Sequence, residues 1–144
     1  MPLLEVKDLC IQFADRKVVD HVSFALERGR TLGIVGESGS GKSVSCMAIM
    51  GLLPPTATIT GGSILFHGIP GEQFYQSQPA ATQAVEMLRL SERQMRHYRG
   101  SRISMVFQEP MTSLNPVHKC GRQVVEMLQM HEDISFRDAR QRVI

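Results

Sequence analysis

The chain has 144 residues, 42% hydrophobic and 21% charged, which is ordinary for a globular protein with one packed core. Sixteen basic against fourteen acidic residues leave a net charge of +2, too small to indicate a nucleic-acid partner. Three cysteines without a C-x-x-C pair and five histidines without metal-ligand spacing argue against a disulfide framework or a zinc motif, and suit a reducing cytoplasm. We expect no signal peptide and no spanning segment, because no apolar run approaches ~20 residues.

Apolar residues in two patterns predict the strands. Residues 4–13, 18–26 and 59–68 show loose alternation or glycine-bracketed apolar runs, and we expect each to form a strand. Residues 31–35 (TLGIV) and 102–107 (RISMVF) are short and almost continuously apolar. Such runs are typical of strands buried on both faces of a parallel sheet.

Helices are expected between these strands. The composition favours helix over residues 42–53, stopped by Pro54 and Pro55, over residues 80–99, and over the amphipathic residues 121–131. A last helix should begin at Phe136, because Ser135 stands three residues before an acid in the manner of a capping box. This helix runs to the last residue, so we expect the chain to be the front part of a longer protein.

A phosphate-binding loop is the most specific motif in the sequence. Residues 36–43 (GESGSGKS) fit G-x-x-x-x-G-K-[ST] at every fixed position, between a predicted buried strand and a predicted helix. The glycines let backbone N–H groups point at anionic oxygens, and the helix adds the positive end of its dipole. Lys42 would neutralise the β- and γ-phosphates and the Ser43 hydroxyl would ligate magnesium. A chance match is expected in roughly one chain of this length in a few hundred.

Phe13 ends the first predicted strand, 23 residues before Gly36. Its ring is placed to stack on an adenine base, but an aromatic side chain at a strand end is more often part of the core. The residues alone leave both interpretations open.

The sequence resembles the nucleotide-binding subunits of ABC transporters. The resemblance covers the whole chain and is strongest at residues 33–45 (GIVGESGSGKSVS) and 103–116 (ISMVFQEPMTSLNP). The second segment is similar to the Q-loop region of the subgroup that serves dipeptide, oligopeptide, glutathione and nickel importers. A hydrophobic strand that ends in Gln108 also suits a Q-loop better than a Walker B strand, which would end in an acidic magnesium ligand.

The resemblance implies a site, residue by residue. Residues 36–43 correspond to the Walker A loop, and Gln108 to the Q-loop glutamine, which contacts magnesium and the attacking water. Ser43 and Gln108 are thus the implied magnesium ligands, and Gln108 is the implied catalytic residue. The implied nucleotide-binding residues are Phe13, Gly36, Glu37, Ser38, Gly39, Ser40, Gly41, Lys42, Ser43 and Val44.

Several parts of the family pattern do not occur in this sequence. It has no LSGGQ-like signature, no strand ending in Asp-Glu and no later switch histidine, all of which follow the Q-loop in the family. The resemblance therefore implies ATP and Mg²⁺ binding for this chain, and hydrolysis only for a complete parent. We expect the 144-residue chain alone to be inactive.

The predicted fold is α/β: a P-loop NTPase core with a flanking antiparallel β-subdomain, truncated before the signature motif and Walker B. The expected organisation is an antiparallel β region at 1–30, a P-loop core at 31–68, a variable insertion at 69–100, and the Q-loop with the start of a helical subdomain at 101–144.

The predicted function is the ATP-binding part of an ABC importer ATPase, which powers uptake of peptides, glutathione or nickel at the cytoplasmic face of the inner membrane. Implied partners are permease subunits contacting Gln108 to Pro116, a second ATP-binding subunit and, indirectly, a periplasmic solute-binding protein. Nucleic acid is not expected. Two alternatives stay open: a small P-loop kinase that phosphorylates a metabolite, and a non-catalytic remnant that only binds ATP.

Overall fold

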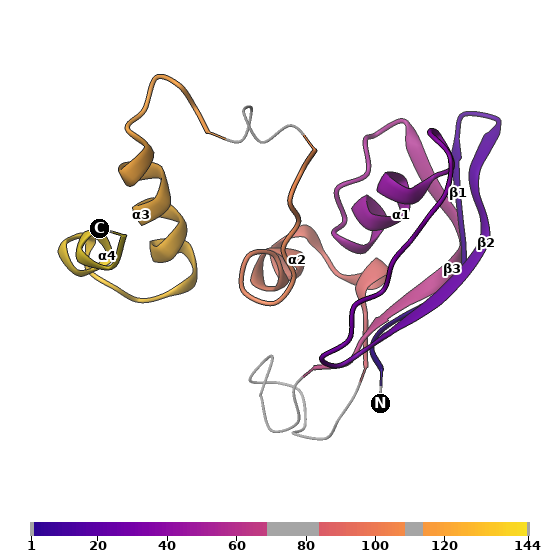
Figure 1. Ribbon diagram of the computed structural model, residues 1–144, viewed down its shortest axis with the longest axis horizontal. Helices are drawn as coiled ribbons and strands as arrows, with labels where there is room; N and C mark the ends of the chain where they lie inside the picture. The colour runs from indigo at the N-terminus through magenta and orange to yellow at the C-terminus, as the bar shows by residue number, and fades with distance from the viewer. Residues whose placement is uncertain (1, 69–83, 109–113, 144) are drawn as a thin grey trace. The chain divides into compact units, whose positions relative to one another are not determined.

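The computed structural model describes residues 2–68, 84–108 and 114–143 (Figure 1). The chain divides into two compact units, Met1–Met95 and Arg96–Ile144. The first unit contains a sheet and a helix, and the second contains two helices that pack against each other. The protein is thus a mixed α/β structure, in agreement with the predicted class.

An antiparallel sheet organises the first unit. Within the described residues it has four strands in the order β2-β1-β3-β4: β1 is Pro2–Phe13, β2 Arg16–Glu27, β3 Ala57–Phe66 and β4 Val85–Glu86. The long strand β1 is central and pairs with β2 on one side and β3 on the other (Figure 1). These three strands confirm the alternation at residues 4–13, 18–26 and 59–68. Their inward side chains form a core that includes Val6, Leu9, Ile11 and Ile64, each at most 1% exposed.

The pairing of β1 with its two neighbouring strands is irregular at several places. The pairing with β3 shifts between Lys7 and Cys10, and the pairing with β2 shifts between Leu9 and Ile11, among other places. At the first shift Gly62 adopts φ 96°, and a Cβ there would lie 2.6 Å from the Leu9 Cα. Only glycine fits this close approach of two backbones, because both the conformation and the space forbid a side chain.

Helix α1 (Lys42–Ile49) lies beside the sheet in the first unit (Figure 1). It begins at the lysine of the glycine-rich loop and buries Ser45, Ala48 and Ile49. It ends at Ile49, four residues earlier than predicted and well before Pro54. Of the predicted strand–loop–helix order, the loop and the helix are therefore observed and the strand is not.

The two segments predicted as buried parallel strands are not strands. Residues 31–35 lie in irregular backbone and expose Val35 at 96%, and residues 102–107 expose Val106 at 91%. Among the described residues, the pairing of these segments is limited to an isolated bridge between Arg99 and Ile103. A buried parallel strand needs a neighbouring strand to pair its backbone and other elements to cover its faces, and the described residues supply no such strand. The predicted parallel core is thus not observed.

The helix predicted over residues 80–99 is largely wrong. Residues 80–83 lie outside the described residues, and β4 and a 3₁₀ turn η1 (Met87–Arg89) precede the only α-helix there, α2 (Glu92–Tyr98). The Glu86 carboxylate accepts hydrogen bonds from the backbone N–H of Ile64 at 2.9 Å and of Leu88 at 3.3 Å. These bonds attach the segment to β3, so tertiary contacts override its helical composition.

The second unit packs α3 (Cys120–His131) against α4 (Phe136–Val143). Val125 and Ala139, 1% and 0% exposed, are the buried residues of the two helices. The Ser135 hydroxyl accepts from the Asp138 N–H at 3.2 Å, which confirms the predicted cap of the last helix. None of the described helices has the length and apolar character that crossing a membrane requires.

Candidate functional site

Three glycines give the loop at residues 36–43 its shape, each for a different reason. Gly36 is held close to Ser40, because a Cβ at position 36 would lie 2.6 Å from the Ser40 Oγ. Gly39 has φ 81° with open space around it, so conformation alone requires glycine. Gly41 has φ 86°, and a Cβ there would lie 2.8 Å from the Val18 carbonyl oxygen. The loop therefore doubles back on itself and ends packed on β2.

Lys42 folds its side chain over the loop that precedes it. Its ammonium donates hydrogen bonds to the carbonyl oxygens of Gly36 and Glu37, both at 2.7 Å, and to the Ser40 Oγ at 3.1 Å. The loop is closed by a turn in which the Ser40 N–H donates to the Glu37 carbonyl at 3.2 Å. The ammonium charge is thus fixed at the mouth of the loop, where it can neutralise an anion.

The first turn of α1 supplies the remaining groups. Ser43 is exposed, Val44 is half-buried, and the next residue, Ser45, is buried with its hydroxyl donating to the Gly41 carbonyl at 3.0 Å. Backbone N–H groups at a helix start attract anions, and an exposed hydroxyl is a hard oxygen ligand of the kind Mg²⁺ takes. The residues present therefore fit a phosphate group accompanied by a magnesium ion.

Phe13 lies in the same unit as the loop. It is half-buried at the end of β1, opposite Arg16 of β2 and Ala57 of β3. A partly exposed ring at a strand end suits either stacking or packing, so its contact with adenine stays a prediction.

Gln108 lies in the second unit and is exposed. The residues that follow it in the predicted contact loop, 109–113, lie outside the described residues. Leu114, the next described residue, is 44% exposed. Its roles toward magnesium and water stay predictions.

Gln123 is an organising residue that the sequence analysis did not single out. Its amide accepts from the Asn115 N–H at 2.8 Å and donates to the carbonyls of Asn115 and His118 at 3.0 and 3.1 Å. One α3 side chain thus fixes the end of the predicted Q-loop region and the residues just after it. A polar residue within an amphipathic helix carries no sequence signal of such bonds.

The loop, its lysine and the helix that follows define a P-loop nucleotide-binding protein. The sequence model of the ABC transporter family matches residues 19–144, and the chain belongs to this family. The P-loop is therefore that of an ATP-binding domain. Membership of this family argues against the alternative that the chain is a small P-loop kinase.

Curated relatives align along almost the whole chain. It is 46% identical to the "Peptidoglycan transport ATP-binding protein YejF" of Agrobacterium fabrum and 44% identical to the "Oligopeptide transport ATP-binding protein OppD" of Bacillus subtilis, each over 99% of this chain. It is 43% identical, also over 99%, to the "Probable peptide ABC transporter ATP-binding protein y4tR" of Sinorhizobium fredii. The chain spans only 24%, 37% and 39% of the lengths of these three relatives.

Proposed function

We propose that this chain is the ATP-binding part of the ATPase subunit of an ABC importer for peptides or a related solute such as glutathione or nickel. The subunit would work at the cytoplasmic face of the inner membrane, paired with a second ATP-binding subunit. The substrate class rests on the names of the relatives, which describe transport of peptides, oligopeptides and peptidoglycan.

The geometry of Lys42 carries the proposal. Its ammonium is the cation fixed over residues 36–40 by three hydrogen bonds, and those acceptors are neutral oxygens. Phosphate oxygens are anionic and accept charge-assisted bonds that are roughly twice as strong. An arriving triphosphate can therefore take over the donors of Lys42 while the glycine backbone and the first turn of α1 surround it.

The Ser43 hydroxyl is the proposed magnesium ligand of the P-loop, and the family resemblance implies Gln108 as a further ligand. The ion would supply neutralisation of charge on the transferred phosphoryl group. Lys42 would hold the phosphates and Ser43 the ion, and the resemblance implies that Gln108 would orient water. Turnover also needs a catalytic carboxylate that this sequence does not provide after a second buried strand, so we propose that the chain alone binds ATP without hydrolysing it.

The test is calorimetric titration of the folded chain with Mg-ATP. Lys42→Ala should weaken ATP binding by at least about tenfold, because it removes the charge-assisted bonds to phosphate. The matched control is Lys119→Ala, since Lys119 is an exposed lysine directly before α3 and should not affect binding. Equal ATP affinity in wild type and a folded Lys42→Ala variant would defeat the proposal.

We also propose that the loop from Gln108 to Pro116 contacts a permease subunit. Leu114 is 44% exposed just before Pro116, and a proline-stiffened loop loses little entropy on binding. In the full-length protein, Leu114→Cys should cross-link to a membrane subunit, whereas Asp133→Cys, exposed after α3, should not. Equal cross-linking from both positions, or from neither, would count against this contact.

A further inference from the structure

A β-bulge in the first hairpin brings three ligand-type side chains together. Leu9 pairs with Val22 and Ile11 pairs with Val19, so the single residue between them on β1, Cys10, faces two residues on β2. Those two residues are Asp20 and His21. A bulge of this kind bends the strand and re-aims side chains that regular pairing would send to opposite faces. His21 takes the conformation that this requires, with φ 50°.

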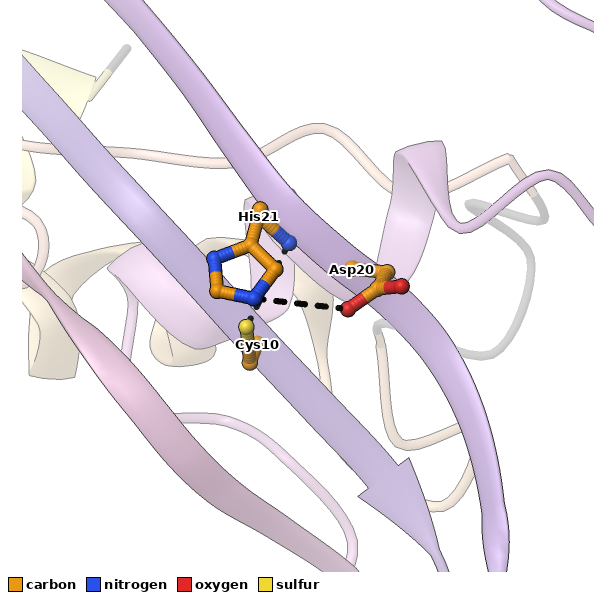
Figure 2. Close-up of side chains that lie close together, drawn as sticks. All are labelled: Cys10, Asp20 and His21. Carbon is orange, nitrogen blue, oxygen red and sulfur yellow. Dashed lines mark hydrogen bonds and ion pairs between the residues drawn. The ribbon is translucent and has the colours of Figure 1, made fainter.

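The potential ligand atoms of Cys10, Asp20 and His21 lie close together. The thiol sulfur, one carboxylate oxygen and one imidazole nitrogen all lie within 4.8 Å of one another (Figure 2). The His21 Nε2 is 3.9 Å from the Asp20 Oδ1. The backbone N–H of His21 donates to the Cys10 Sγ at 3.3 Å. The Cys10 thiol itself donates to the Asp8 carbonyl oxygen at 3.5 Å, and a metal that binds the sulfur replaces this proton.

We propose that Cys10, Asp20 and His21 bind a thiophilic divalent cation of the Zn²⁺ type. Ligand bonds of about 2.0 to 2.3 Å in a tetrahedron place ligand atoms roughly 3.3 to 3.8 Å apart. Closing the site therefore needs a shift of about half an ångström for the His21–Asp20 pair, and up to about an ångström for a pair at the 4.8 Å limit. Water completes the fourth position. Binding releases the Cys10 thiol proton to solvent.

The donor set separates this site from the magnesium site proposed at Ser43. Thiolate and imidazole ligands suit zinc, whereas Mg²⁺ prefers oxygen ligands and keeps its water. Zinc binding at the bulge should therefore persist in a large excess of Mg²⁺. A bound cation would also join β1 to β2 at the strand position where the hairpin is least regular.

Lys17 competes for the same carboxylate. Its ammonium lies 3.0 Å from the Asp20 Oδ1. A metal cation bound to Asp20 would therefore lie close to the positive charge of Lys17 and be repelled by it. Removing Lys17 should therefore strengthen metal binding, an effect that a purely structural cluster would not produce.

Co²⁺ is the direct probe, since tetrahedral thiolate coordination gives visible and sulfur-to-metal charge-transfer bands. The starting protein carries Cys46→Ser and Cys120→Ser, which removes the two cysteines outside the cluster. We expect one Co²⁺ per chain, displaced by one Zn²⁺ and insensitive to Mg²⁺. Lys17→Met should tighten binding by several-fold.

Ligand variants should weaken Co²⁺ binding by at least about tenfold, since even outer-shell changes cost 10- to 100-fold. The variants are Cys10→Ser, Asp20→Asn and His21→Asn, the last chosen because asparagine tolerates positive φ. Asp15→Asn, in the turn of the same hairpin, is the matched control and should bind as before. Circular dichroism confirms that each variant is folded. Absence of thiolate bands, or unchanged binding in folded Cys10→Ser, would overturn the proposal.

Discussion

The antiparallel sheet and the two exposed apolar segments have similar amino-acid character but different structures. Strands β1, β2 and β3 bury their inward side chains, down to 0% exposure at Leu9 and Ile64. Residues 31–35 and 102–107 are as apolar, yet they expose Val35 at 96% and Val106 at 91%. Composition therefore does not decide which apolar run becomes a strand.

The difference lies in where the pairing partners come from. Strands β1 and β2 form a hairpin joined by a two-residue turn, so the partner is adjacent in sequence. Parallel strands need a long crossover connection between them, and the two apolar segments belong to different units of the chain. Hydrophobic runs predict burial, but a strand also requires its hydrogen-bonding neighbour.

The largest expected effect compares one glycine from each region. Gly62→Ala should lower the free energy of unfolding by about 4 kcal/mol, because the new Cβ meets the Leu9 Cα and the Lys7 carbonyl, each at 2.6 Å, at a positive φ. Gly33→Ala, with nothing within 4 Å, should change it by less than about 0.5 kcal/mol. Urea denaturation measures both. Equal destabilisation would mean that the two regions are equally ordered.

A matched pair of valines gives a smaller effect. Val6→Ala removes methyl groups from a side chain 1% exposed and should cost about 2 kcal/mol of unfolding free energy. Val35→Ala alters a side chain 96% exposed and should stay within about 0.5 kcal/mol. Thermal and urea unfolding check both values. If Val35→Ala proved as costly as Val6→Ala, residues 31–35 would have to be packed in solution.

The smallest effect concerns the ion pair between Glu5 and Lys7 on β1. The Lys7 ammonium, 2.6 Å from the Glu5 carboxylate, lowers the pKa of Glu5, and His67 at 3.0 Å adds to this. The pKa of Glu5 in the folded protein is below its ordinary value, so the pair stabilises the fold fully at a pH above that ordinary pKa. The stabilisation is lost as the pH falls through the lowered pKa. Carboxyl NMR should show the Glu5 midpoint rising in Lys7→Met; an unchanged midpoint would remove Lys7 as the cause.

Sequence patterns anticipated what depends on neighbours along the chain. The P-loop follows from spacing alone, the hairpin strands follow from alternation, and the cap at Ser135 follows from an acid three residues later. The helix expected over residues 80–99 was largely wrong because Glu86 bonds to β3 instead. In these cases the deciding interaction is local, whereas the failed helix depends on a contact across the fold.

The metal-ligand cluster was missed for a related reason. Cys10 and His21 are separated by 11 residues along the chain, and no motif spacing links them. They meet because strand pairing folds β2 back on β1 and the bulge sets two residues against one. Spacing rules recognise ligands that share a turn or helix, whereas this arrangement requires the strand register.

The contact of Gly41 with β2 links the shape of the P-loop to the hairpin. Gly41, directly before Lys42, lies against Val18, because a Cβ added at Gly41 would be only 2.8 Å from the Val18 carbonyl oxygen. A Cβ added at Gly39 would have no neighbour within 4 Å. The loop thus contacts β2 at its end, whereas open space surrounds Gly39 in its middle. We therefore expect substitutions in β2 near Val18 to shift the backbone that leads into Lys42, and so to change the proposed ATP affinity without altering a proposed nucleotide-binding residue.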